Sequence, residues 1–196
     1  MSTAQRRRGA ALEEALVDAA WAELGRSGYD GFTIDAVAKA AGTSRAVLYR
    51  RWPNRAALVH AAVRAHLGSI ADLVPDTGEL RQDVLVTLQT ITDRVGLVGV
   101  DVMTGLLSEL AELPEALATT VPDVFGRLVA RAAERGEIGP GHVPEPVLRM
   151  PGDLVRYEMI TTREAPGTER LRALVDELFL PLVHHHAGDR DLKSRS

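Results

Sequence analysis

A basic segment without acidic residues is the most distinctive chemical feature of this sequence. Between Ala36 and Ala71 there is no Asp or Glu, whereas one Lys and five Arg supply six positive charges. The whole chain has a net charge of −4, so the remainder of it carries −10. Guanidinium groups pair with phosphates and with guanine edges. The pattern favours one DNA-facing patch on an acidic protein; the alternative is a solvated basic face on some other all-α domain.

Two short helices around one glycine are expected to position these charges. Thr33 is suited to cap the first helix, whose apolar residues recur at helical spacing. Gly42 follows where that helix must stop, because glycine accepts a positive φ without a Cβ clash. Ser44 can cap the second helix, whose inward face would be Val47 and Leu48. This outline predicts a helix-turn-helix, which sets its second helix into the DNA major groove.

The candidate DNA contacts are the polar side chains on the outward positions of this motif. Arg45 opens the second helix, so we expect it to read base edges, while Arg55 opens the next helix and is expected to contact phosphates. The full predicted set is Thr33, Ser44, Arg45, Tyr49, Arg50, Arg51 and Arg55.

A wider constellation of residues surrounds the motif. It comprises Leu16, Ala19, Ala20, Leu24, Gly28, the run Thr33 to Gly42, Leu48, Tyr49, Trp52, Arg55 and Leu58. This order resembles the DNA-binding domain of the tetracycline-repressor (TetR) family over roughly residues 8–60. That family usually shows leucine-tyrosine, a variable residue, histidine, phenylalanine and, three residues on, lysine. Here Arg51, Trp52 and Arg55 take the last three places, which keeps an aromatic plug and a basic phosphate contact.

The resemblance also implies an architecture and partners. It implies that the last two helices form a four-helix interface in a homodimer, and that the helices before them surround a pocket for an inducing small molecule. Double-stranded operator DNA is then the expected macromolecular partner.

Length and composition set the class of protein. A chain of 196 residues, 45% hydrophobic and 26% charged, is ordinary for a soluble globular protein with a proper core. The absence of cysteine excludes disulfides, thiolate metal sites and cysteine nucleophiles. No apolar run approaches the ~18 residues of a membrane span, and the first residues lack the apolar core of a signal peptide. We therefore expect a cytoplasmic protein.

Turn-forming residues suggest how an all-α chain is divided. We expect a DNA-binding domain over residues 1–53, joined by a long helix 54–74 to a ligand-binding and dimerisation domain over residues 75–186. Residues 187–196 are predicted to be a disordered tail. The final helix, about 168–184, carries more apolar surface than one helix buries on a single side, which indicates contact with a partner subunit.

Polar or aromatic residues on apolar helix faces are the ligand candidates. Between Glu79 and Val183 the amphipathic stripes must bury against each other or around a largely apolar pocket. The alternative is a solid bundle in which the same residues are ordinary core. The candidates are Thr87, Met103, Phe125, Arg156, Tyr157 and Met159.

Other constellations give no support for catalysis or metal binding. His184 to His186 are adjacent, so they do not share one helix face, and they lack a ligating partner at the i+3 or i+4 position. Glu109 and Glu112 share a helix face but are most simply solvent-facing. There is no phosphate-binding glycine loop and no nucleophile elbow. We expect no enzyme activity, no cofactor and no metal.

Three functional hypotheses follow from the sequence. The first is a transcriptional repressor that a small molecule releases from its operator. The second keeps that architecture but has no inducer, so that abundance or a protein partner controls it. The third is a helical interaction protein whose helix-turn-helix no longer binds DNA.

Overall fold

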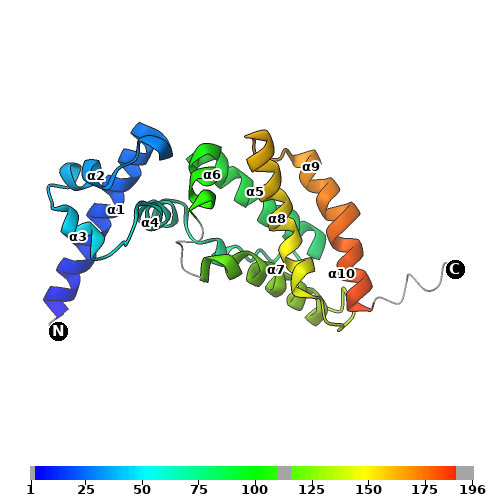
Figure 1. Ribbon diagram of the computed structural model, residues 1–196. Helices are drawn as coiled ribbons and strands as arrows, with labels where there is room; N and C mark the ends of the chain where they lie inside the picture. Colours follow the sequence, from blue (N-terminus) through cyan, green and yellow to red (C-terminus); the bar gives the residue numbers. More distant parts are fainter. Residues whose placement is uncertain (1–2, 110–115, 189–196) are drawn as a thin grey trace. The chain divides into compact units, whose positions relative to one another are not determined.

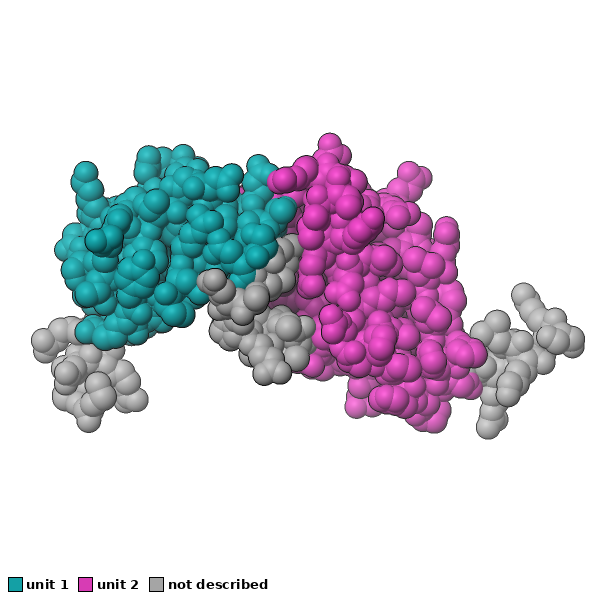
Figure 2. All heavy atoms as spheres, viewed as in Figure 1, with its two compact units in different colours: residues 1–69, 101–113 teal, residues 70–100, 114–196 magenta. Residues whose placement is uncertain are grey.

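Every element within residues 3–109 and 116–188, the part of the protein that this computed structural model describes, is a helix (Figure 1). The prediction of an all-α fold is confirmed. The chain forms two compact units (Figure 2): unit 1 contains residues 1–69 and 101–113, and unit 2 contains residues 70–100 and 114–196. No helix in the described part is both long and apolar enough to cross a membrane.

Unit 1 is built around its first helix. The helices are α1 (Thr3–Gly31), α2 (Ile34–Ala40), α3 (Arg45–Tyr49), α4 (Arg55–Leu67) and, from Asp101 onward, α6 (Val100–Ser108). Helix α1 packs along α4 and also contacts α2. The core contains fully buried side chains from each of these first four helices, among them Leu16, Val37, Leu48, Leu58 and Val59.

Helix α4 is shorter than the sequence pattern suggested. The predicted helix 54–74 is wrong, because α4 ends at Leu67. Gly68 has φ 80° while its N–H donates to the Arg64 carbonyl oxygen at 2.9 Å, which closes the last turn and redirects the chain. Only a short 3-10 turn, η1 (Ile70–Asp72), follows before α5.

Unit 2 is a bundle of longer helices. They are α5 (Leu80–Val98), α7 (Ala116–Glu134), α8 (Glu145–Thr162) and a continuous stretch made of α9 (Thr168–Ala173), the π-helical turn η3 (Leu174–Phe179) and α10 (Leu180–Ala187). Pro181 has no N–H to donate to the preceding turn, and the helix widens into η3, which ends two residues before it. Of the predicted tail, Ala187 is the last residue of α10, and residues 189–196 lie outside the described part.

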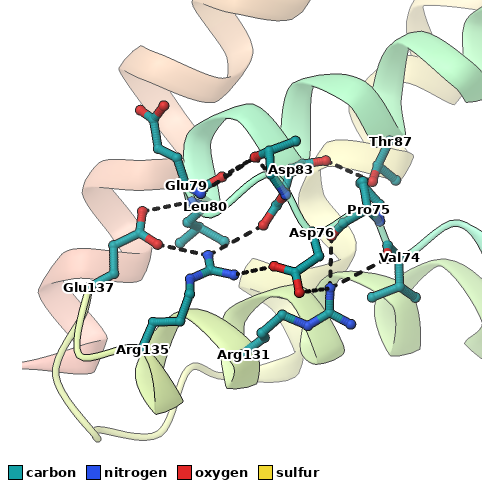
Figure 3. A network of polar contacts seen from close by, with 11 residues as sticks. Val74, Pro75, Asp76, Glu79, Leu80, Asp83, Thr87, Arg131, Arg135 and Glu137 are labelled. Atoms are coloured by element: carbon teal, nitrogen blue, oxygen red, sulfur yellow. Dashed lines mark hydrogen bonds and ion pairs between the residues drawn. The ribbon is translucent and has the colours of Figure 1, made fainter.

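One arginine at the end of α7 and one directly after it hold the segment between η1 and α5 (Figure 3). Arg131 donates to the Pro75 carbonyl oxygen at 2.9 Å, and Arg135 pairs with Asp76 at 3.1 Å and with Asp83 at 3.3 Å. Asp83 is fully buried and accepts bonds from the Thr77 N–H at 2.6 Å and the Thr77 hydroxyl at 2.7 Å. A buried carboxylate is costly without hydrogen-bond partners, and these contacts supply them. The network therefore fixes how the chain enters α5.

Candidate nucleic-acid interface

The two predicted helices of the motif, α2 and α3, are present with the expected glycine between them. Thr33 is extended at φ −132°, and its hydroxyl accepts a bond from the Ala36 N–H at 3.2 Å, so it caps α2. Gly42 takes a positive φ of 63° in the turn. Leu48 anchors α3 by its complete burial, and Trp52 is 8% exposed just beyond that helix. These anchors fix the outward face of α3.

That outward face carries polar groups that are open to solvent. Ser44 stands at the N-cap position, but its exposed side chain makes no capping bond, contrary to our expectation. Tyr49 is 52% exposed and Arg50 is exposed at the end of α3. Arg51 is half-buried and donates to the Val47 carbonyl oxygen at 3.4 Å. We call Ser44, Arg45, Tyr49 and Arg50 the reading face.

Arg45 is paired with an acidic residue of α2. Its Nη1 donates to Oδ2 of Asp35 at 3.0 Å, and its Nε lies 2.9 Å from Oδ1. Both side chains are 63% exposed, so the pair is accessible from solvent. Sequence reasoning missed Asp35, because it weighed only the basic residues of the motif. The sequence did contain a signal for this pair, since Asp35 and Arg45 lie ten residues apart on either side of a tight turn.

Arg55 is held in a different manner, against α6. Its Nη2 lies 2.6 Å from a carboxylate oxygen of Glu109, and its guanidinium stacks 4.7 Å above the centre of the Tyr29 ring. Glu109 is only 24% exposed, so the expectation that it simply faces solvent was wrong. Glu112, which we expected on the same helix face, lies outside the described residues. We call Tyr29, Arg55, Gly105 and Glu109 the α6 seat.

The α6 seat perturbs its ionisable groups in consistent directions. The hydrogen bond from Arg55 lowers the pKa of the Glu109 carboxyl, and the same bond raises the pKa of Arg55. Burial raises the pKa of the Tyr29 phenol, and the neighbouring Glu109 adds to that rise. Gly105 leaves the room for this ring, since a Cβ there would lie 2.1 Å from a Tyr29 ring atom. The ring, the ion pair and the glycine thus form one packed contact.

The predicted ligand residues are dispersed. Thr87 is fully buried, but its hydroxyl donates to the Asp83 carbonyl oxygen of its own helix at 2.9 Å. Phe125 is fully buried against Phe179, with ring centres 5.6 Å apart. Both are therefore core residues of unit 2 whose groups are already engaged.

The four remaining candidates do not gather at one place. Met159 is buried in unit 2, whereas Met103 lies on α6 in unit 1. Arg156 reaches Asp153 at 3.4 Å, and Tyr157 is 66% exposed. No three His, Asp or Glu side chains among the described residues gather where they could hold a metal ion.

Unit 2 also has hollows that are open to solvent. A groove of about 570 Å³ runs between α8 and the stretch α9–η3, and Tyr157 is the one ligand candidate among its lining residues. A second hollow of about 640 Å³ is lined by Ala71 of η1, by residues of α7 and by Leu148 of α8. Three exposed apolar side chains line the groove, namely Leu154, Tyr157 and Leu178. Ile160 of α8 and Leu182 of α10 are exposed as well.

Models of protein families match both parts of the chain. Residues 16–62 match a model described as bacterial regulatory proteins, tetR family. Residues 74–178 match a model described as tetracyclin repressor-like, C-terminal domain.

Individual proteins agree with these matches. An uncharacterised HTH-type transcriptional regulator of Mycobacterium tuberculosis is 33% identical over 174 residues, 84% of this chain and 84% of the relative. The DNA-binding transcriptional repressor TetR of Mycobacteroides abscessus is 34% identical over 139 residues, 67% of this chain and 73% of that protein.

Solved structures share the fold. A TetR-family regulator from Mesorhizobium loti superposes with a TM-score of 0.55 at 15% identity, covering 90% of this chain and 96% of that one. The flavonoid-responsive regulator FrrA gives a TM-score of 0.52 at 20% identity and covers 89% of this chain and 95% of its own.

Proposed function

Because the chain belongs to the TetR family of transcriptional regulators, we propose that it is a dimeric repressor that a small molecule releases from operator DNA. Residues 1–53 bind the DNA, and residues 75–186 bind the ligand and the second copy. The observation that carries the proposal is the reading face, where polar groups point to solvent on a helix anchored by the buried Leu48. The protein acts in the cytoplasm, where its operator lies.

The side chains of the motif have different roles in this proposal. Arg45 reads a base edge, while Ser44, Tyr49 and Arg50 contact the flanking backbone. Thr33 shapes α2 through its cap and lies exposed beside the same surface. Arg51 and Arg55 are already engaged in the free protein, by a main-chain carbonyl and by Glu109 respectively. A phosphate contact from Arg55 therefore requires exchange of its partner.

A gel-shift with DNA from the protein's own upstream region tests DNA binding. We expect a discrete complex that outlasts competition by random duplex. The double variant Arg45→Ala/Arg50→Ala should abolish it, whereas Arg149→Ala/Arg172→Ala, which removes the same charge from exposed sites of unit 2, should not. No complex with any upstream fragment would favour the interaction-protein hypothesis.

A second copy of the chain is the proposed partner of the exposed apolar face on unit 2. Leu178 is 47% exposed and Tyr157 is 66% exposed beside the 570 Å³ groove, an arrangement that water disfavours. A dimer would present two copies of α3 to half-sites about 34–36 Å apart, or a multiple of that spacing. Leu178→Glu should give a monomer in analytical ultracentrifugation, and Leu97→Glu, at a 72% exposed site of α5, should leave the dimer intact. A monomeric wild type at micromolar concentration would contradict this.

A hollow of unit 2 is the proposed site of the ligand. The hollow of about 640 Å³ beside η1 is in the size range of small-molecule sites. A coupling of about 1–3 kcal/mol between ligand and DNA would weaken DNA binding by about 5- to 150-fold. Screening small molecules by thermal shift and then by release of the gel-shift complex tests this. Binders that stabilise the protein without releasing DNA would favour control by abundance or by a protein partner.

A further inference from the structure

The acidic residue that holds Arg45 lies at the edge of the reading face. Asp35 belongs to the first turn of α2, whose start is fixed by the Thr33 cap, and Arg45 is the first residue of α3. The turn between the two helices brings one carboxylate oxygen to 3.0 Å from Nη1 and the other to 2.9 Å from Nε. The direction of the Arg45 side chain is thus set by a neighbour from another helix.

From this arrangement we propose that Asp35 is a specificity-determining residue, which positions Arg45 for a guanine edge and weakens its attraction to phosphates. The inference rests on the proposed DNA-binding function and deepens it. Asp35 acts through Arg45, so it is a positioning residue rather than a DNA contact.

The donors of Arg45 leave room for this role. A guanidinium carries five N–H groups, and Asp35 engages the side of the group where Nε and Nη1 lie. One N–H of Nη1 and both N–H groups of Nη2 stay available, and one N–H from each of these two nitrogens can meet the acceptors O6 and N7 of guanine. A guanidinium already held by a carboxylate loses less side-chain freedom on meeting the base than a free one does.

The charge of Asp35 acts against the competing contact. A phosphate that approaches Arg45 meets a carboxylate within 3.0 Å of the same guanidinium, and two anions around one cation repel each other. A guanine edge carries no net charge, so it avoids most of this repulsion. Asp35 should therefore lower the affinity for random DNA more than the affinity for an operator with guanine at this position.

The alternative is that the Asp35–Arg45 pair serves to stabilise the fold, and its exposure argues against this. Both side chains are 63% exposed, and pairs this exposed add little to the free energy of unfolding. The carboxylate also suits the first turn of α2, whatever its partner. What the pair does change is the direction of the Arg45 side chain and the net charge around its guanidinium.

The experiment compares Asp35→Asn with a matched loss of charge, Asp30→Asn, at an exposed residue of the same unit. Binding is measured by fluorescence anisotropy, from low to physiological salt, on the upstream operator duplex and on a random duplex of equal length. For Asp35→Asn we expect tighter binding to the random duplex, a salt slope steeper by about 1, and an operator-to-random ratio reduced about tenfold. Asp30→Asn should leave that ratio nearly unchanged, and Asp35→Glu should restore part of it.

A double-mutant cycle links the effect to Arg45. In the background of Arg45→Ala, the change Asp35→Asn should no longer alter the operator-to-random ratio. If the ratio falls equally in that background, or if Asp35→Asn behaves as Asp30→Asn does, Asp35 acts only as a general charge and the inference is overturned. If the wild type does not prefer its operator to random duplex, the proposed function fails and this inference fails with it. An unchanged melting temperature for the Asp35 variants verifies that they are folded.

Discussion

The reading face and the α6 seat use the same kind of ion pair in contrasting surroundings. Arg45 and Asp35 are each 63% exposed, with solvent around both. Arg55 and Glu109 are 38% and 24% exposed, and the guanidinium of Arg55 also lies over the Tyr29 ring. The exposed pair leaves the other N–H groups of Arg45 open to a ligand. A new partner for Arg55 would have to replace a ring contact and a half-buried charge together. The surroundings of an arginine, more than its place in the sequence, decide what it can bind.

Two arginines extend the comparison to unit 2. Arg131 lies on the last turn of α7 and Arg135 directly follows that helix, and their guanidinium groups contact Pro75, Asp76 and Asp83 (Figure 3). In sequence they resemble a basic stripe as much as Arg50 and its neighbours do. In the structure they hold a chain segment, whereas Arg45 and Arg50 of the reading face are exposed to solvent.

The largest effect is expected from filling the space under the Tyr29 ring. In Gly105→Ala the new Cβ would lie 2.1 Å from a ring atom of a side chain that is 2% exposed. Overpacking of this kind costs about 1–3 kcal/mol. Urea denaturation followed by tryptophan fluorescence measures it, since Trp21 and Trp52 both belong to unit 1. The control is Gly25→Ala on α1 of the same unit, where a Cβ has open space; an equal loss in both variants would contradict the tight seat.

Removing the base-reading cation should give the next largest effect. Arg45→Ala should lose about 1–3 kcal/mol of discrimination at a single base pair of the operator. Binding to a set of operators, each changed at one position, measures this by anisotropy. Arg50→Ala should instead weaken binding to all of them to a similar extent. A uniform loss with Arg45→Ala would show that Arg45 contacts phosphate only.

Local chemistry made much of unit 1 predictable. The Thr33 cap, the turn at Gly42 and the buried Leu48 depend on residues close in sequence, and all three are present as expected. The end of α4 was missed because apolar residues continue beyond it to Val74, and periodicity alone does not register the positive φ of Gly68.

Long-range contacts account for most of what the sequence could not predict. Arg55 and Glu109 are 54 residues apart, and no local pattern relates them. The predicted pocket residues illustrate a second limit. Thr87 lies on an apolar face, as a ligand anchor would, but its hydroxyl bonds to its own helix. A polar group on an apolar stripe therefore does not by itself indicate a cavity.

A comparison of both partners in the α6 seat sharpens the role of Arg55 on DNA. If Arg55 contacts a phosphate, Arg55→Ala should weaken binding to operator and random duplex alike and lower the salt slope by about 1. Glu109→Gln keeps the cation and releases it, so its salt slope should be unchanged or steeper. A salt slope unaffected by Arg55→Ala, measured by anisotropy, would leave Arg55 with a structural role only.

The smallest effect concerns acid stability and comes from Glu109. The bond from Arg55 lowers the pKa of this carboxyl below its ordinary 4.5 in the folded state. Below pH 4.5 the unfolded chain therefore takes up a proton that the folded chain resists, so the contribution is present above that pH and is lost as the pH falls through the folded pKa. Since the pair is partly exposed, solvent screening limits the contribution to about 1 kcal/mol or less.

Only a difference between variants isolates this contribution, because other carboxylates also titrate in acid. The free energy of unfolding of unit 1, from urea titrations with tryptophan fluorescence, should be lower in Glu109→Gln than in the wild type at neutral pH. The gap should close as the pH is lowered below 4.5.

At the alkaline end, the raised pKa of Tyr29 keeps its phenol protonated in the folded state, so the free energy of unfolding should fall above about pH 10. Tyr29→Phe should lack that alkaline loss while the acid limb persists, and a gap between Glu109→Gln and wild type that is constant with pH would contradict the ion pair with Arg55.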